Sequence, residues 1–279
     1  MAFLRFLTYD PVRDPSKMKV RVPQKTFPTK IVKGLLAELI GTLFLVFFCG
    51  GSVTAAFYFP DGDPAARILL IATIQGFALA AIIYAISGVS GCNLNPAITV
   101  ANLLSGRTGF INALAYIIGQ VIGCIAGAGI LYACIEWRYQ MRLGNTRLGD
   151  GIPAGNGFLM ELFTTCLLCL VVLGTSVFNV WDRRLNRIAP FAIGMTLFAG
   201  VAVANPFTGG SLNPVRTLGP SIISGTWANA WIYWAGPLIG GVLAAFIFRV
   251  LLQERFDVID KPGYVPFDFT SFKGDMQTY

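Results

Sequence analysis

The sequence predicts an all-α membrane protein with six transmembrane helices, two re-entrant half-helices and an inverted internal repeat. Three observations lead to this fold class. The chain of 279 residues is 55% hydrophobic and only 13% charged, which is far too apolar for a soluble domain. Six apolar stretches are long enough to cross a bilayer. Two short runs that contain glycine and Asn-Pro interrupt this pattern at corresponding places in the two halves.

The charge distribution and the missing histidines exclude several classes of function. The net charge of +7 comes from short flanks between apolar stretches and not from a basic stripe with interleaved aromatic residues, so we expect no nucleic-acid partner. The absence of His excludes zinc sites that need it and Ser-His-Asp catalysis. No other constellation of nucleophile, base or metal ligands stands out. We therefore expect no enzyme, no cofactor and no bound metal.

The N-terminal segment, residues 1–33, carries eight Lys or Arg and two Asp with four scattered prolines. It lacks a charged start followed by an apolar core and a small-residue cleavage site. We therefore expect a cytoplasmic tail and no cleaved signal peptide. We expect the membrane domain over 34–252 and a second cytoplasmic tail over 253–279.

Six apolar spans make up the membrane domain, each near the ~20 residues needed to cross a bilayer. They are residues 34–58, 68–89, 109–134, 157–180, 188–205 and 228–252. Six crossings place both termini on one side. With the termini inside, sixteen Lys and Arg face the cytoplasm against four on the other face, which favours cytoplasmic termini. We expect the plasma membrane, with an internal membrane as the alternative.

The two halves of the membrane domain, about 34–134 and 157–252, form a duplication. Matching segments relate them: 34–38 with 157–161, and 112–119 with 229–236. Each half has three spans, an odd number, so the second half must enter the membrane inverted.

The two Asn-Pro runs, 91–98 and 209–216, lie between apolar stretches and therefore at membrane depth. Irregular backbone is tolerated there only where protein buries it or where it lines a watery cavity. Asn as a helix cap followed by Pro at the first helical position fits a helix start. Each run would open a helix of roughly 12 residues, which rises about 18 Å and spans about half a bilayer. In an inverted repeat the two half-helices enter from opposite faces and meet near the midplane.

Facing helix N-termini would place two amide donors, Asn95 and Asn213, and two positive dipole ends at one point of a narrow pore. A water molecule there turns its oxygen toward both amides, which interrupts proton relay along the file, while the dipoles repel cations. The alternative for each Asn is a purely structural helix cap.

Three charged residues lie at membrane depth. Arg216 costs at least ~2.5–3.5 kcal/mol on insertion scales, so it should face the pore and not lipid, unless it forms an ion pair with Glu38 or Glu161. Both carboxylates need partners when buried, and we expect them to accept backbone N–H groups of the two loops. A proton-relay role, as in a pump, is the alternative for them.

With these residues the sequence resembles the aquaporin, or major intrinsic protein, family over roughly 32–252. The resemblance is carried by the repeat order, by Glu38 and Glu161, and by two boxes, the second of which is followed by Arg216. The boxes are Asn95-Pro96-Ala97 and Asn213-Pro214-Val215, and the family usually has Ala at the position of Val215. The resemblance implies a passive channel in the lipid bilayer that assembles as a homotetramer, with Arg216 in the selectivity filter.

The resemblance also assigns the rest of the filter, to Gln75, Val201 and Gly210. Water-selective members carry an aromatic residue and a His there, glycerol-type members carry two aromatics, and this chain has neither, which predicts a wider constriction. Four other residues follow the water-channel pattern: Thr217, Ser221, Tyr233 and Trp234. We therefore expect a channel for water, with small neutral solutes such as hydrogen peroxide, urea or glycerol, that excludes protons and ions. The alternatives are a coupled secondary transporter of a small neutral solute and a junctional or scaffold protein with a vestigial pore.

Five of the six cysteines lie inside or at the ends of apolar spans, where thiols behave as small hydrophobes. Cys92 is the exception, and the duplication maps it onto Gly210. We expect Cys92 to line the cytoplasmic half of the pore and to bind mercurials there, whereas replacing any of the other five should not abolish inhibition. The alternative for Cys92 is a buried small hydrophobe.

Overall fold

The computed structural model describes residues 27–58, 61–181 and 183–252, and all regular structure within them is helical. The helices are α1 (Phe27–Tyr58), α2 (Pro64–Ser90), α3 (Pro96–Leu104), α4 (Phe110–Cys134), η3 (Trp137–Tyr139), η4 (Met141–Gly144), α5 (Ala154–Trp181), α6 (Arg183–Thr208), α7 (Pro214–Ser224), α8 (Ile232–Ile247) and η5 (Phe248–Leu252). Among these described residues, six helices are long and apolar enough to cross a membrane: α1, α2, α4, α5, α6 and α8. The predicted fold class is confirmed.

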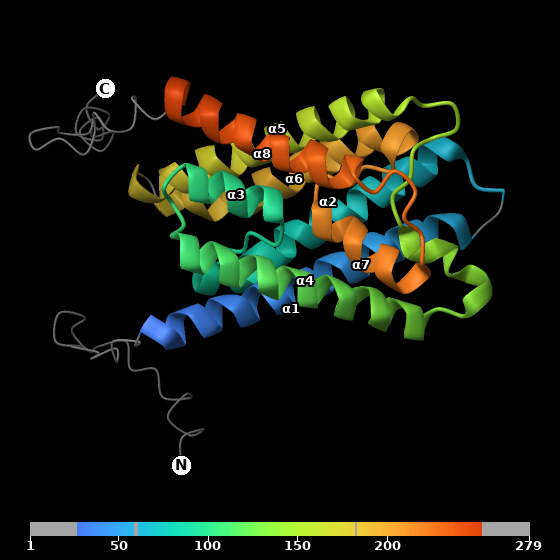
Figure 1. Ribbon diagram of the computed structural model, residues 1–279, viewed down its shortest axis with the longest axis horizontal. Helices are drawn as coiled ribbons and strands as arrows, with labels where there is room; N and C mark the ends of the chain where they lie inside the picture. Colours follow the sequence, from blue (N-terminus) through green and yellow to red (C-terminus); the bar gives the residue numbers. More distant parts are fainter. Residues whose placement is uncertain (1–26, 59–60, 182, 253–279) are drawn as a thin grey trace, which may run out of the picture.

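The first helix begins earlier than predicted. α1 begins at Phe27 and not at residue 34, because the helix continues outward past the apolar stretch into the polar segment that precedes it. Residues 1–26 and 253–279, which make up most of the two predicted tails, lie outside the described residues. In Figure 1 the start of α1 and the end of α8 lie at the same end of the bundle, as an even number of crossings requires.

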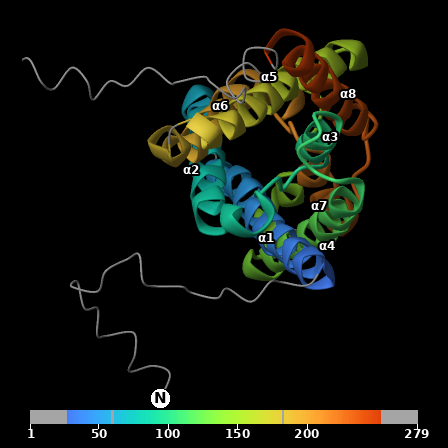
Figure 2. The ribbon, with the colours of Figure 1, turned by 90° about the vertical axis from the view of Figure 1, so that its left-hand side faces the viewer.

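The two repeats pack in the same way, which confirms the predicted inverted repeat. α1 contacts α4 in the first repeat as α5 contacts α8 in the second. The half-helices are exchanged: α3 packs on α8 of the second repeat, and α7 packs on α4 of the first. Figure 2 shows α1, α2 and α4 on one side, α5, α6 and α8 on the other, and α3 and α7 between α4 and α8.

The half-helices α3 and α7 begin at the two Asn-Pro boxes, as predicted. Asn95 adopts extended backbone, and its Oδ1 accepts the N–H of Ala97 at 2.9 Å. Asn213 caps α7 in the same way by accepting the N–H of Val215 at 3.1 Å. The two helices contain 9 and 11 residues. Each is therefore about half as long as a membrane-spanning helix.

The loops that lead into the half-helices share one conformation. Leu94 and Leu212, each directly before the capping Asn, both have a φ of +54°. A left-handed φ is uncommon for a residue other than glycine and costs free energy unless surrounding contacts over-determine it. Both leucines are also completely buried. Tertiary contacts must therefore hold the loops in this shape.

Glycines let the first and last helices of each repeat approach closely. In α4 a Cβ atom on any of three glycines would lie within 2.4 Å of a carbonyl oxygen of α1. Gly119 faces the carbonyl of Leu35, Gly123 that of Leu39, and Gly127 that of Leu43. On α8, a Cβ on Gly240 would lie 2.4 Å from the carbonyl oxygen of Leu162 in α5. These glycine stripes therefore serve packing within one chain.

We expect Gly123→Ala to destabilise the protein by about 1–3 kcal/mol, because the added methyl group would overpack the α1–α4 contact. Gly129→Ala in the same helix is the matched control, since a Cβ there meets nothing within 4 Å. The measurement is thermal unfolding in detergent, followed by circular dichroism. Equal midpoints for the two variants would contradict the close contact between α1 and α4.

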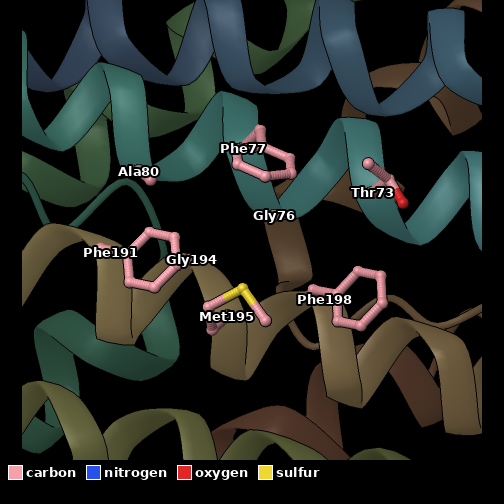
Figure 3. A pocket seen from close by; sticks show the side chains of 8 residues that line it. All are labelled: Thr73, Gly76, Phe77, Ala80, Phe191, Gly194, Met195 and Phe198. Carbon is pink, nitrogen blue, oxygen red and sulfur yellow. The ribbon is translucent and has the colours of Figure 1, made fainter.

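A separate apolar groove lies on the outside of the bundle where α2 and α6 cross. Gly76 and Gly194 make the crossing possible, because a Cβ on either would lie within 2.7 Å of the carbonyl oxygen of the other. Figure 3 shows the groove, which has a volume of about 220 Å³. The side chains of Phe77, Phe191 and Met195 along it are exposed on the outer surface of the described chain. This groove is therefore not part of a path through the molecule.

Candidate functional site

Glu38 of α1 holds the loop in front of α3. Its side chain is fully buried. Its Oε1 accepts the N–H of Asn93 at 2.9 Å and the hydroxyl of Ser90 at 2.6 Å, and its Oε2 accepts the N–H of Leu94 at 2.7 Å. The Nε2 of Gln120 in α4 also donates to Oε2, at 2.8 Å. One carboxylate thus satisfies four donors and fixes the strained turn at Leu94.

Glu161 of α5 does the same in the second repeat. It is fully buried, and its Oε1 accepts the N–H of Ser211 at 2.9 Å and the hydroxyl of Thr208 at 2.7 Å. Its Oε2 accepts the N–H of Leu212 at 2.7 Å. Tyr233 of α8 donates its hydroxyl to the carbonyl of Thr208 at 2.8 Å, which ties the loop to the last helix. The carboxylate thus accepts two backbone N–H groups of the second loop, as Glu38 does in the first.

Gln120 was not among the predicted site residues. Besides Glu38, its Nε2 also contacts the hydroxyl of Thr99 in α3, at 2.9 Å. The sequence does contain a signal for Gln120, because it is a polar amide in the middle of an apolar span. Such residues face the interior of a helix bundle and form hydrogen bonds there. Its place in the second repeat is taken by Pro237, so the duplication gives no parallel for it.

The two loops are joined to each other by the capping asparagines. The Nδ2 of Asn95 donates to the carbonyl of Leu212 at 2.8 Å, and the Nδ2 of Asn213 donates to the carbonyl of Leu94 at 2.9 Å. Each amide group carries two N–H donors and uses one of them in this reciprocal pair. Within the described residues the second N–H of each amide has no protein acceptor. The structure therefore brings both predicted amides to one point.

A narrow cavity of about 20 Å³ lies at this point. A cavity must offer about 10–15 Å³ to hold one water molecule, so this one holds about one. Its polar lining comes chiefly from the two loops and α7, and its apolar lining comes from α1, α2, α3, α5 and α6. The lining residues are Leu45, Cys49, Gln75, Leu79, Asn93, Asn95, Ile98, Leu168, Leu197, Ser211, Asn213 and Arg216.

Arg216 of α7 borders the cavity and has N–H donors without a protein acceptor in the described residues. Only 2% of the residue is exposed, and its Nη1 donates to the carbonyl of Gly144 at 2.6 Å. Its Nε and Nη2 are buried and have no hydrogen-bond partner in the described part of the chain. The bonded partner is a carbonyl of η4, in the connection between the repeats, and not Glu38 or Glu161. The guanidinium can therefore donate to a solute in the cavity.

The other three residues assigned to the filter lie in different surroundings. Gln75 borders the cavity, and its Nε2 points to α1, where it contacts the hydroxyl of Ser52 at 3.2 Å. Val201 and Gly210 pack against each other, since a Cβ on Gly210 would lie 3.2 Å from the Cα of Val201. Neither is among the residues that line the cavity. The wider constriction expected from the missing rings stays a prediction.

The unusual Val of the second box faces away from the cavity. Val215 is fully buried in a small apolar cluster with Val46 of α1 and Cys124 and Ala128 of α4. Ala97 of the first box instead lies against α8, where a Cβ on Gly241 would be 2.5 Å from the carbonyl oxygen of Ala97. Val215 therefore packs behind α7 and is not among the residues that line the cavity.

Cys92 lies in the loop before α3 with a φ of +61°, and its N–H donates to the hydroxyl of Ser90 at 3.0 Å. It is 6% exposed and belongs to the apolar core. The cysteine that borders the narrow cavity is Cys49, which was not predicted. Reaction of Cys92 with mercurials stays a prediction.

Comparison with known proteins agrees with this arrangement. The family model described as Major intrinsic protein matches residues 25–248. Aquaporin A of Dictyostelium discoideum is 64% identical over 262 residues, which cover 94% of this chain and 93% of that protein. Human Aquaporin-1 is 34% identical over 229 residues, which cover 80% of this chain and 83% of that protein.

A solved structure shows the same fold. The X-ray structure of the aquaglyceroporin from Plasmodium falciparum matches with a TM-score of 0.69 at 20% identity, over 82% of this chain and 99% of that one. Because the family model covers most of the chain and two relatives exceed 30% identity over at least 80% of each chain, this multi-pass membrane protein belongs to the major intrinsic protein family, the family of the aquaporins.

Proposed function

We propose that this protein is a passive transmembrane channel for water that excludes protons and ions. The observation that carries the proposal is the cavity of about 20 Å³ between the amides of Asn95 and Asn213. Each amide uses one N–H in its hydrogen bond to the opposite loop, and its second N–H has no acceptor within the described residues. The names of relatives such as Aquaporin A and Aquaporin-1 support the same function.

In this proposal the two asparagines orient each water molecule that passes. Its oxygen accepts one N–H from Asn95 and one from Asn213, so its own hydrogens point along the pore and away from the centre. A proton cannot hop through a water that cannot accept another hydrogen bond, and the N-termini of α3 and α7 add a positive potential. Arg216 lines the same cavity and adds a full positive charge against cations.

The other predicted residues support the pore in this proposal. Pro96 and Pro214 start the two half-helices, while Ala97 and Val215 pack them against the surrounding helices. Glu38 and Glu161 hold the loops. Gln75 and Arg216 border the narrow cavity, and Val201 with Gly210 closes the wall beside it.

Stopped-flow light scattering of proteoliposomes tests the proposal. Vesicles that contain the full chain should respond to an osmotic step faster than protein-free vesicles, and a pH-sensitive dye inside should report no added proton flux. A response equal to that of protein-free vesicles would refute a water channel and favour a scaffold with a vestigial pore. A solute flux that follows an imposed proton or sodium gradient would instead favour a coupled transporter.

The cavity argues against coupling to an ion gradient, and the family of the chain argues against enzymatic activity. Coupled transporters bind their ions at midplane sites of carbonyls or ionisable groups. Among the lining residues, Arg216 is the one side chain that carries a charge, and a cation would not bind beside it. The family to which the chain belongs consists of channels, in agreement with the expectation that it is no enzyme.

The size of the cavity leads to a prediction for the solutes. We expect permeability to fall in the order water, hydrogen peroxide, urea, glycerol, because a passage for about one water excludes solutes by their width. The measurement is the reflection coefficient of each solute in the same proteoliposomes. Urea that passes as fast as water would show that the pore is wider in its working state, and Val201→His should then narrow it.

The chain's assembly and orientation are further parts of the proposal. A homotetramer in the lipid bilayer is what the family resemblance implies, and many apolar side chains are exposed on the outside of the bundle, where lipid or other copies of the chain can cover them. Native mass spectrometry from detergent would detect it. Cytoplasmic tails at both ends of a channel domain over 34–252 are supported by the charge distribution. Location in the plasma membrane is a further prediction. Protease protection of terminal tags, with fluorescence imaging of the tagged chain, would test both.

A further inference from the structure

Three hydroxyl groups form a row that ends at the second Asn-Pro box, and we call Thr146, Thr217 and Ser211 the hydroxyl row. Thr146 lies in the connection between the repeats, and its Oγ1 is 2.6 Å from the Oγ1 of Thr217 in α7. The Oγ1 of Thr217 is 2.8 Å from the Oγ of Ser211. Ser211 in turn donates to the carbonyl of Asn213 at 2.8 Å. None of the three side chains belongs to a residue more than 5% exposed, so the row is buried along its length.

The direction of every hydrogen bond in the hydroxyl row follows from its inner end. A carbonyl oxygen only accepts, so Ser211 must use its one proton on Asn213. Thr217 must then donate to Ser211, and Thr146 must donate to Thr217. Hydrogen bonds in such a row polarise and strengthen one another. The hydroxyl of Thr146 is therefore the outermost donor of a row that holds the backbone of Asn213.

The first repeat holds its capping asparagine in a similar way but takes the outer donor from another element. Thr99 donates its hydroxyl to the carbonyl of Asn95 at 3.0 Å. The Nε2 of Gln120 in α4 donates to the Oγ1 of Thr99 at 2.9 Å. The residue that corresponds to Gln120 in the second repeat is Pro237, whose side chain has no donor. In the second repeat Thr146 supplies the donor instead.

The backbone around Thr146 also fits against the second loop. A Cβ on Gly209 would lie 3.1 Å from the Cα of Thr146. Gly144, two residues earlier, accepts the Nη1 of Arg216 at 2.6 Å. Neither Thr146 nor Thr217 is among the residues that line the narrow cavity. A change of the Thr146 side chain therefore alters what holds the loop and not the width of the cavity.

We propose that Thr146 is a positioning residue for the second capping asparagine and, through it, for proton exclusion. The proposal rests on the proposed water channel, in which the amide N–H of Asn213 that the opposite loop does not use points at each passing water. Without the hydroxyl of Thr146, Thr217 loses a donor at a buried position, and the bonds that fix Asn213 weaken. The amide then tilts more freely. A water beside it can turn and pass a proton on.

Thr146→Val is the test, because it removes the hydroxyl and keeps the branched shape of the side chain. The full chain in proteoliposomes is measured for proton flux under an imposed pH difference and for osmotic water flux. We expect the ratio of proton flux to water flux to rise about two- to tenfold, the factor that one lost hydrogen bond of typical strength gives. Water flux itself should stay near the wild-type value, because the cavity lining is unchanged.

Two controls separate positioning from packing. Thr146→Ser keeps the hydroxyl and should keep the wild-type flux ratio. Thr165→Val removes a fully buried threonine hydroxyl that has no hydrogen-bond partner in the described part of the chain, and it should also leave the ratio unchanged. Thr146→Ala replaces the valine variant if that one does not fold.

The outcomes separate this inference from the proposed function. Wild-type vesicles without added water flux would refute the channel, whatever happens at Thr146. A conducting channel whose flux ratio is the same in Thr146→Val as in the wild type would overturn the positioning role alone. The same conclusion would follow if Thr146→Ser leaked as much as Thr146→Val, since the hydroxyl would then not matter. An equal rise in Thr165→Val would overturn it as well, because any lost buried hydroxyl would then have the same effect.

Discussion

Glu161→Ala is expected to abolish water flux and to destabilise the protein. The variant leaves the N–H groups of Ser211 and Leu212 without their acceptor in a buried loop. The hydroxyl of Thr208 keeps only its longer contact, 3.3 Å to the carbonyl of Ala204. Each unsatisfied buried donor costs about 1–3 kcal/mol. The left-handed φ of Leu212 loses the contacts that hold it, so the loop should relax and move Asn213 out of register with Asn95. Stopped-flow permeability and thermal unfolding of the purified variant measure the two effects.

Two further variants sharpen this prediction. Glu161→Gln keeps one acceptor oxygen but turns an amide N–H toward backbone donors, so its flux and stability should lie between those of the wild type and Glu161→Ala. Glu136→Ala is the control, because that carboxylate is exposed and pairs with exposed Arg138 at the end of the bundle. The supporting role of Glu161 would be wrong if the alanine variant conducted water as well as the control.

Arg216→Val is expected to raise proton and cation leakage at least about tenfold, because every 1.4 kcal/mol removed from a barrier gives a factor of ten. A unit charge at about 4 Å from a passing cation contributes about 4 kcal/mol at an effective dielectric constant of 20. Water flux should stay similar or rise, since the shorter side chain leaves more room in the cavity. The measurement is proton flux under an imposed pH difference, together with osmotic flux, in the same vesicles.

Arg249→Val is the control for the removal of one positive charge. Arg249 lies in η5, donates to the carbonyl of Leu104 at 3.0 Å and does not border the cavity. Its loss should leave proton flux at the wild-type level. If Arg216→Val leaked no more protons than Arg249→Val at equal expression and water flux, Arg216 would not be an electrostatic barrier, and the two helix N-termini would have to supply the exclusion alone.

The sequence by itself determined the architecture, because the signals for it are local. Apolar length predicts each crossing, and an Asn-Pro pair between apolar stretches predicts a helix that starts at membrane depth. An odd number of spans in each repeat then requires that α3 and α7 meet from opposite faces. Glu38 and Glu161 could be assigned to the loops because a buried carboxylate needs hydrogen-bond donors, and the sequence places few other polar groups at the same membrane depth.

Only the tertiary structure decided which side chains border the cavity. α1 is apolar around most of its circumference, so periodicity does not reveal that Cys49 faces inward. Gly144 lies 72 residues from Arg216 in the sequence, in a connection without a regular pattern, and no local signal pairs its carbonyl with the guanidinium. Val201 and Gly210 were assigned to the filter by position, but the close approach of α6 to the second loop packs them together. Pore width depends on such contacts between distant segments, and these are made only when the helices pack.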